Sequence, residues 1–255
     1  MSKFLAPLMF LFLSHMPALA SQLISDLSTN EVAIEANFTG QNILLFGAIE
    51  KNRDVQQDII VIIKGPPQAV TVRRKEKHYG IWLNGTQKNF AAVPSYYAIA
   101  STQPLSRITL SAELRRHSAG LGFLPVTYAE ASDAPLVQTT QHKSEYIDGL
   151  IRNKMAIGMY RENSQGVRLI DGKLFRAEIA LPPGIPVGVY EARTLLFENG
   201  ILTSQQRNKI NVGIGGIEQL LHRWAFERPA LYGVVGVLIS IFCGWGTALA
   251  FRRRA

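Results

Sequence analysis

The sequence predicts a mainly β protein: an immunoglobulin-like β-sandwich with a helical insertion, followed by one C-terminal transmembrane α-helix. Three observations lead to this class. Short apolar runs are separated by turns of Gly, Pro and Asn. In the middle of the chain the apolar residues recur at helical spacing instead, and residues 229–251 carry no charge. Hydrophobic residues make up 47% of the chain, which is enough for a buried core. Two small domains divided near residues 100–140 are the alternative.

Residues 1–20 are predicted to be a signal peptide. Lys3 precedes an apolar run over residues 4–13, and Pro17-Ala18-Leu19-Ala20 gives a break and small residues at the spacing that signal peptidase accepts. We expect cleavage after Ala20. An uncleaved anchor is the weaker alternative, because so short an apolar core does not comfortably cross about 30 Å of hydrocarbon.

Residues 21–213 are predicted to form a β-rich periplasmic domain. Residues 31–37 alternate apolar and polar side chains, Thr39-Gly40 marks a turn, and residues 42–49 are apolar, so a hairpin is expected. Residues 58–64 are mostly β-branched, as in a buried strand, and end at two prolines. Further strands are expected at residues 70–73, 80–83, 90–99, 166–170, 174–181, 187–197 and 201–212.

Two helices are expected inside this domain, near residues 104–119 and 144–160, where apolar residues recur at helical spacing. The later strands include the step Gly188-Val189-Tyr190, which resembles the entry into a long strand near the end of an immunoglobulin-like sandwich. In Pro94-Ser95-Tyr96-Tyr97, exposed tyrosines would indicate a partner surface; we expect them to be buried instead.

The C-terminal part is predicted to meet and cross the membrane. Residues 214–228 form a juxtamembrane amphipathic helix, and at about 1.5 Å per residue the apolar run 229–251 reaches roughly 34 Å, enough to span. Positive charge stays on the cytoplasmic side, so residues 252–255 with Arg252, Arg253 and Arg254 are expected in the cytoplasm. The predicted place is therefore the bacterial inner membrane, with one span and the bulk in the periplasm.

Small residues recur every four positions in this span, and they form a candidate helix-packing face: Gly236, Ser240, Gly244 and Ala248. The alternative is that such residues are simply common in membrane helices. The only cysteine, Cys243, lies in the same run, so the exported domain cannot contain a disulfide.

The formal charge of +8 does not indicate a nucleic-acid partner. Part of it belongs to Lys3 and the three terminal arginines, which are topology signals at the hydrophobic ends. The surplus that remains on the exported domain is mild.

Motifs for chemistry are absent from the sequence. It contains no Gly-x-Ser-x-Gly elbow, phosphate-binding loop or dinucleotide fingerprint. His78, His117, His142 and His222 are not spaced as paired metal ligands. We therefore predict no catalytic residues, no metal site and no cofactor, and a protein that is not an enzyme; an envelope enzyme stays a third hypothesis.

The basic segment Arg73-Arg74-Lys75-Glu76-Lys77-His78 lies between a strand and the aromatic residues Tyr79 and Trp82. Arg73, Arg74 and Lys75 form a candidate anion-binding site, since guanidinium groups grip sulfate, phosphate or carboxylate with paired hydrogen bonds. The alternative is a solvated, charged hairpin edge that discourages aggregation.

Several short motifs, in order along the chain, resemble a family of alphaproteobacterial transmembrane proteins. They are Phe38-Thr39-Gly40, Leu45-Phe46-Gly47-Ala48, Lys64-Gly65-Pro66-Pro67, Val72-Arg73-Arg74-Lys75-Glu76, Gly80-Ile81-Trp82, Val93-Pro94-Ser95-Tyr96-Tyr97-Ala98, Leu181-Pro182, Gly188-Val189-Tyr190 and Leu231-Tyr232-Gly233. The resemblance implies the architecture and a bacterial origin, and it loosely associates such proteins with permeases resembling sulfite exporters. It implies no activity.

We expect the chain to act as a non-enzymatic accessory whose periplasmic domain binds another inner-membrane protein such as a permease. The alternative is a small-anion-binding module that uses Arg73–His78. The oligomeric state is left open.

Overall fold

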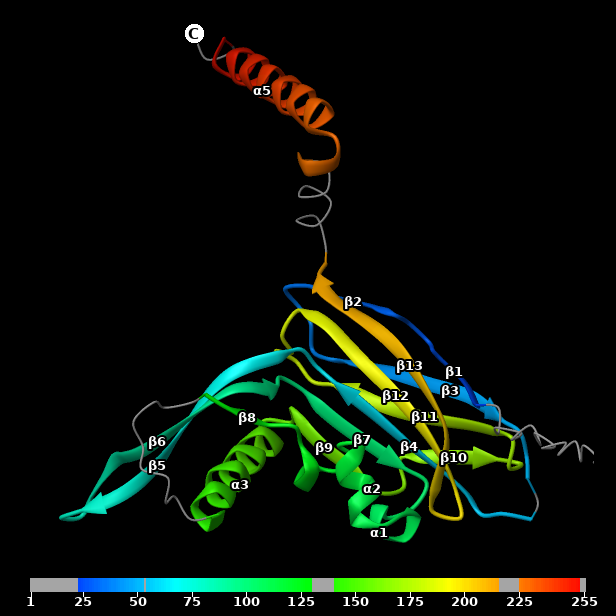
Figure 1. The fold of residues 1–255 in the computed structure, drawn as a ribbon. Coiled ribbons are helices and arrows are strands. Elements are labelled where there is room, and N and C mark those ends of the chain that lie inside the picture. The colour runs from blue at the N-terminus through cyan, green and yellow to red at the C-terminus, as the bar shows by residue number, and fades with distance from the viewer. Residues whose placement is uncertain (1–22, 53, 130–139, 216–224, 253–255) are drawn as a thin grey trace, which may run out of the picture.

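The computed structural model describes residues 23–52, 54–129, 140–215 and 225–252. The predicted signal peptide, most of the juxtamembrane segment, and Arg253 and Arg254 lie outside these residues. Most of the described chain between residues 23 and 215 is built from strands, as expected, with a few helices, and an apolar helix follows (Figure 1).

Two sheets contribute to one hydrophobic core. The four-stranded sheet has the order β1 (Leu23–Leu27), β3 (Gln41–Ile49), β11 (Leu174–Leu181) and β10 (Val167–Ile170). The six-stranded sheet has the order β2 (Glu31–Ile34), β13 (Ile201–Ile214), β12 (Gly188–Glu198), β4 (Gln57–Lys64), β7 (Tyr97–Ser101) and β9 (Tyr160–Asn163). Leu45 and Phe175 of the first sheet and Val61 of the second are buried in this shared core.

A second core lies on the other face of the six-stranded sheet. The strand β4 is buried on both faces, because Ile59, Val61 and Ile63 enter the first core while Ile60 and Ile62 enter the second. This explains why its sequence is apolar without alternation. The helices and the base of a long hairpin cover this side (Figure 1).

The expected hairpin of residues 31–49 is wrong. The strand β2 pairs in parallel with β13 in the six-stranded sheet, whereas β3 pairs antiparallel with β1 and β11 in the other sheet. Gly40 lies at the crossing between sheets with φ +107°, and a Cβ there would be 2.7 Å from the carbonyl oxygen of Leu181. The turn residues therefore carry the chain between sheets instead of reversing it within one.

Both expected helices are present with other bounds. The first is two short helices, α1 (Leu105–Ile108) and α2 (Ser111–Arg116), separated by Thr109 in an extended conformation. A 3-10 turn, η1 (Leu121–Phe123), follows. The second is α3 (Thr140–Ala156), which ends earlier than predicted because Gly158 takes φ +75° and β9 begins at Tyr160.

The long hairpin joins β5 (Pro67–His78) and β6 (Ile81–Pro94), with the short β8 (Thr127–Tyr128) at its base. The base is packed in the second core, where Phe90 is buried and Val70 and Val72 are partly buried. From Arg73 to Lys88 the hairpin projects away from the sheets (Figure 1). We call residues 73–88 the arm.

The C-terminal helix α5 (Pro229–Arg252) is long and apolar enough to cross a membrane. Its stretch Pro229–Thr247 has a mean hydropathy of 1.7 and is not buried against the rest of the protein. This fits the predicted membrane span.

Candidate functional site

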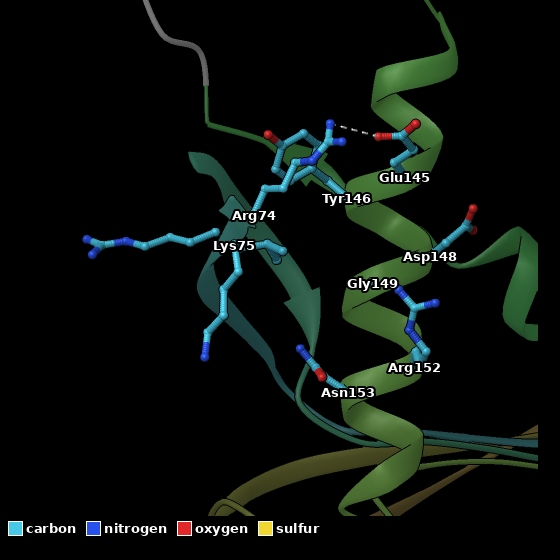
Figure 2. A pocket seen from close by; sticks show the side chains of 10 residues that line it. Arg74, Lys75, Glu145, Tyr146, Asp148, Gly149, Arg152 and Asn153 are labelled. Carbon is cyan, nitrogen blue, oxygen red and sulfur yellow. Dashed lines mark ion pairs between the residues drawn. The ribbon is translucent and has the colours of Figure 1, made fainter. Parts of the chain in front are cut away.

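The predicted anion-binding residues line an open cleft of about 500 Å³ between β5 and α3 (Figure 2). The strand contributes Val72 and the three basic residues Arg73, Arg74 and Lys75. The helix contributes Glu145, Tyr146, Asp148, Gly149, Arg152 and Asn153. α3 supplies six of the ten lining residues, and the sequence does not indicate this because the two segments are far apart in the chain.

The cleft holds charges of both signs. The Arg74 guanidinium lies 3.5 Å from a Glu145 carboxylate oxygen, and both side chains are more than half exposed. Figure 2 shows Arg74 directed at Glu145, with Lys75 pointing elsewhere. An anion would therefore compete with Glu145 for Arg74, and the three basic residues do not converge on one point.

Tyr146 fixes α3 against the arm. It is buried, and its hydroxyl lies 2.6 Å from Thr86 Oγ1 on β6. Leu150, one helical turn later, enters the second core. The base of the arm is thus supported by α3.

The tip of the arm is apolar on both faces. Tyr79 is fully exposed, and Ile81 and Trp82 are 65% and 64% exposed. Successive side chains of a strand point to opposite faces, so Ile81 and Leu83 share one face and Trp82 lies on the other. The aromatic residues are visible in the sequence, but their exposure on both faces of the hairpin is not.

A second exposed apolar surface crosses the outer face of the four-stranded sheet. Ile24 pairs with Ala48, which pairs with Leu174, which pairs with Ile170, so one row crosses all four strands. Ile24 is 57% and Leu174 54% exposed. Phe46 extends the row along β3. We call these five residues the sheet patch.

Charged residues border the sheet patch. Phe46 stands between Asp26 and Arg176 in the register, and Arg176 pairs with Arg168. The signal in the sequence was residues 43–49, where apolar side chains occupy both faces of β3 although only one face enters a core. In the sequence alone, this run predicts only a strand.

The predicted helix-packing face lies on α5. Ser240 Oγ donates to the Gly236 carbonyl oxygen at 2.9 Å, and a Cβ added at Gly236 or Gly244 would meet nothing within 4 Å. The side chains of Ala248 and Arg252 are outside the described part of the chain.

Two of the histidines lie beside glutamate side chains. His78 lies 3.6 Å from Glu76, and His117 lies 3.6 Å from Glu113. Burial lowers the pKa of His117. Within the ranges that the structure describes, no group of three or more His, Cys, Asp or Glu could hold a metal ion. His222 lies outside those ranges, and the side chain of His142 is not among the described ones.

The expected burial of Tyr96 and Tyr97 is confirmed. Tyr96 enters the first core and Tyr97 the second, and their hydroxyls donate to the carbonyl oxygens of Ala180 at 3.0 Å and Ser118 at 2.7 Å. Burial raises the pKa of both side chains. These tyrosines join structural layers and form no partner surface.

Comparison with known proteins places the chain in a family. No curated protein and no solved structure matches it. A family model does match, over residues 22–253, so it includes the strands, the arm and α5. The chain belongs to the family described as "Putative transmembrane protein (Alph_Pro_TM)".

Proposed function

We propose that this protein is a non-enzymatic accessory subunit: its exported domain binds another inner-membrane protein, such as a permease, through the sheet patch. The observation that carries the proposal is the row Ile24, Ala48, Leu174 and Ile170 on a sheet face that no described element covers. An apolar centre with a charged border is the usual anatomy of a protein interface.

The proposed topology is a single pass with the domain in the periplasm. A signal peptide removed after Ala20 exports residues 21–213, α5 anchors them, and Arg252, Arg253 and Arg254 hold the C-terminus in the cytoplasm. N-terminal sequencing of the mature protein and protease accessibility in spheroplasts test it. An intact N-terminus, or a C-terminal tag cleaved from outside, would contradict it.

We interpret the exported domain as one immunoglobulin-like sandwich with a helical insertion between β7 and β10. The strand orders of the two sheets support this interpretation. The edge strands β1 and β2 belong to different sheets, and β12 pairs with β13 in the six-stranded sheet. Tyr190, near the start of β12, donates its hydroxyl to the carbonyl oxygen of Pro186 at 2.7 Å, as a tyrosine corner does. The sharing of β4 by both cores favours one domain over two.

The first experiment is crosslinking in intact cells, followed by purification through a tag on the native protein and mass spectrometry. Leu174→Arg should remove the partner, because a charge in the patch centre must then be desolvated on binding. Ile201→Arg is the matched control: Ile201 is 70% exposed but lies at the end of another sheet. Equal recovery of the partner with both variants would refute the sheet patch as its docking site.

The helix-packing face is a separable part of the proposal. Replacing Gly236, Ser240 and Gly244 together with leucine blocks close helix approach while keeping α5 apolar. Loss of the partner would assign it a transmembrane contact, and unchanged complexes would remove that part alone.

The second candidate is small-anion binding at the arm's basic cleft. It is favoured by the open cleft that Arg73, Arg74 and Lys75 line together with Arg152 of α3. Calorimetry on the full chain in detergent, with sulfite, sulfate, phosphate and carboxylates, tests it. Glu145→Gln should tighten binding by freeing Arg74, and no heat from any of these anions would exclude it.

A further inference from the structure

The arm differs from the sheet patch in having apolar side chains around its whole tip. At the apex Tyr79 is fully exposed; Ile81 and Leu83 lie on one face and Trp82 on the other. A flat protein surface could cover one face and would leave the other in water. A medium that surrounds the tip would cover all of it.

The turn at the apex is occupied by an unfavourable residue. Tyr79 and Gly80 have φ values of +48° and +88°, the two-residue turn in which Asn-Gly is preferred. The chain uses that preferred pair elsewhere: Asn199 and Gly200, with φ of +48° and +84°, join β12 to β13. A bulky aromatic side chain in this conformation is strained, and the full exposure of Tyr79 leaves little packing inside the protein to offset the strain.

Behind the tip the arm is strongly basic. The strands β5 and β6 carry Arg73, Arg74, Lys75, Lys77 and Lys88 against one acid, Glu76. Glu76 is near His78, at 3.6 Å. An apolar tip with aromatic residues, followed by a cationic collar, matches the layers of a bilayer surface: acyl chains and interface first, then phosphate groups.

The exported domain is tethered to the helix that is proposed to cross the membrane. About 14 residues separate Ile214, the end of β13, from Pro229, the start of α5, and at about 3.3–3.6 Å per residue they span at most roughly 50 Å. The end of β13 is therefore held within that distance of the bilayer that α5 crosses.

We propose that the tip of the arm inserts into an anionic lipid surface, with Tyr79, Ile81, Trp82 and Leu83 in the interface and the basic residues of β5 at the phosphate groups. This contact is separate from the docking of a protein on the sheet patch. Each basic residue near an anionic surface raises the partition constant about fivefold, so Arg73, Lys75 and Lys77 together account for about a hundredfold.

The test uses the full chain with Cys243→Ser, which removes its only cysteine. A spin label is placed by Ile81→Cys, and in a matched control by Ile201→Cys, because both isoleucines are exposed and directly follow the two equivalent turns. Each protein is reconstituted in nanodiscs of phosphatidylcholine alone or an equal mixture with phosphatidylglycerol. Collision of the label with oxygen and with a water-soluble nickel complex reports its depth.

In the mixed lipid, the label at residue 81 should gain oxygen contact and be shielded from nickel, and the label at residue 201 should stay open to nickel. Shielding at 81 should weaken in phosphatidylcholine alone and with Arg73→Glu, Lys75→Glu and Lys77→Glu. Combined Tyr79→Asn and Trp82→Thr, which suit the turn and strand, should also weaken it while leaving the arm folded.

Equal nickel access at 81 and 201 in the mixed lipid would overturn the proposal. So would shielding that appears only in native membrane extracts and is absent from pure lipid, because the arm would then bind a protein. Neither result bears on partner loss with Leu174→Arg, so the two proposals fail independently.

Discussion

Two hairpins in this protein have the same turn but opposite surroundings. β12 and β13 are joined by Asn199-Gly200, and Gln56 N–H donates to Asn199 Oδ1 at 3.1 Å while Asn199 N–H donates to the Gln56 carbonyl oxygen at 3.0 Å. β5 and β6 are joined by Tyr79-Gly80, with Tyr79 fully exposed. The first turn is held by its neighbours, and the second projects from the fold.

The strands behind these turns differ in the same way. β12 is buried along most of its length, with Phe197 fully covered in the second core. The arm is exposed on both faces from Arg73 to the tip. An isolated two-stranded hairpin is at best marginally stable in water, so the arm depends on α3 at its base and on whatever covers its tip. Residues of the arm whose type is unfavourable for their backbone conformation are therefore informative.

The largest difference is expected from removing one large aromatic side chain in each hairpin. Phe197→Ala leaves a cavity in the second core and should lower the free energy of unfolding by about 3–5 kcal/mol. Trp82→Ala removes an exposed side chain and should change it by less than about 0.5 kcal/mol. Denaturant unfolding of the full chain in detergent measures both. A large loss with Trp82→Ala would mean that the arm is packed against the protein.

High pH should weaken the two cores through four tyrosines. Burial raises the pKa of Tyr96, Tyr97 and Tyr160, and raises that of Tyr190 to about 12. In the unfolded chain tyrosine has a pKa of about 10, so the folded state binds protons more tightly. Stability is thus fully present below about pH 10 and is lost as pH rises through the higher folded values.

Unfolding midpoints measured from neutral pH to pH 12 check this, and Tyr190→Phe should make the decline shallower. The same substitution costs about 1 kcal/mol at neutral pH, because the hydrogen bond to Pro186 is lost. A decline above pH 10 that is unchanged in Tyr190→Phe would show that this hydroxyl does not contribute.

Much of the sheet structure could be predicted from the sequence, because its signals are local. The apolar run 58–64 indicated a buried strand, and the alternation and turns marked most of the others. Pairing is not a local property. The pattern of residues 31–49 suits a hairpin as well as it suits two strands in different sheets. Only the pairing of β2 with β13 in the six-stranded sheet decides against the hairpin.

The candidate surfaces were harder to predict for the same reason. The basic residues Arg73, Arg74 and Lys75 were visible in the sequence, but Glu145, which binds Arg74, comes from α3. The sheet patch is assembled from four strands, and each contributes one or two apolar residues that are unremarkable alone. The tip of the arm, in contrast, is continuous in sequence, so its aromatic residues are visible there, although their exposure is not.

Exchanging the turn residues tests the comparison of the two hairpins most directly. Asn199→Tyr loses the hydrogen bond from Gln56 and puts a bulky residue at φ +48°, so it should destabilise the protein by about 1–2 kcal/mol. Tyr79→Asn removes the same strain at the tip and should stabilise the arm against local opening by about 1 kcal/mol. Because the arm opens separately from the cores, global unfolding should not change.

Hydrogen exchange of the β5 and β6 amides in the full chain in detergent measures the stability of the arm against local opening. Denaturant unfolding measures the free energy of global unfolding. If Tyr79→Asn leaves exchange in the arm unchanged, the tyrosine is not strained there, and the structural argument for its role outside the protein fails. If exchange slows as expected while the variant inserts less well into anionic nanodiscs, then the chain keeps a residue that weakens its own hairpin because that residue binds lipid.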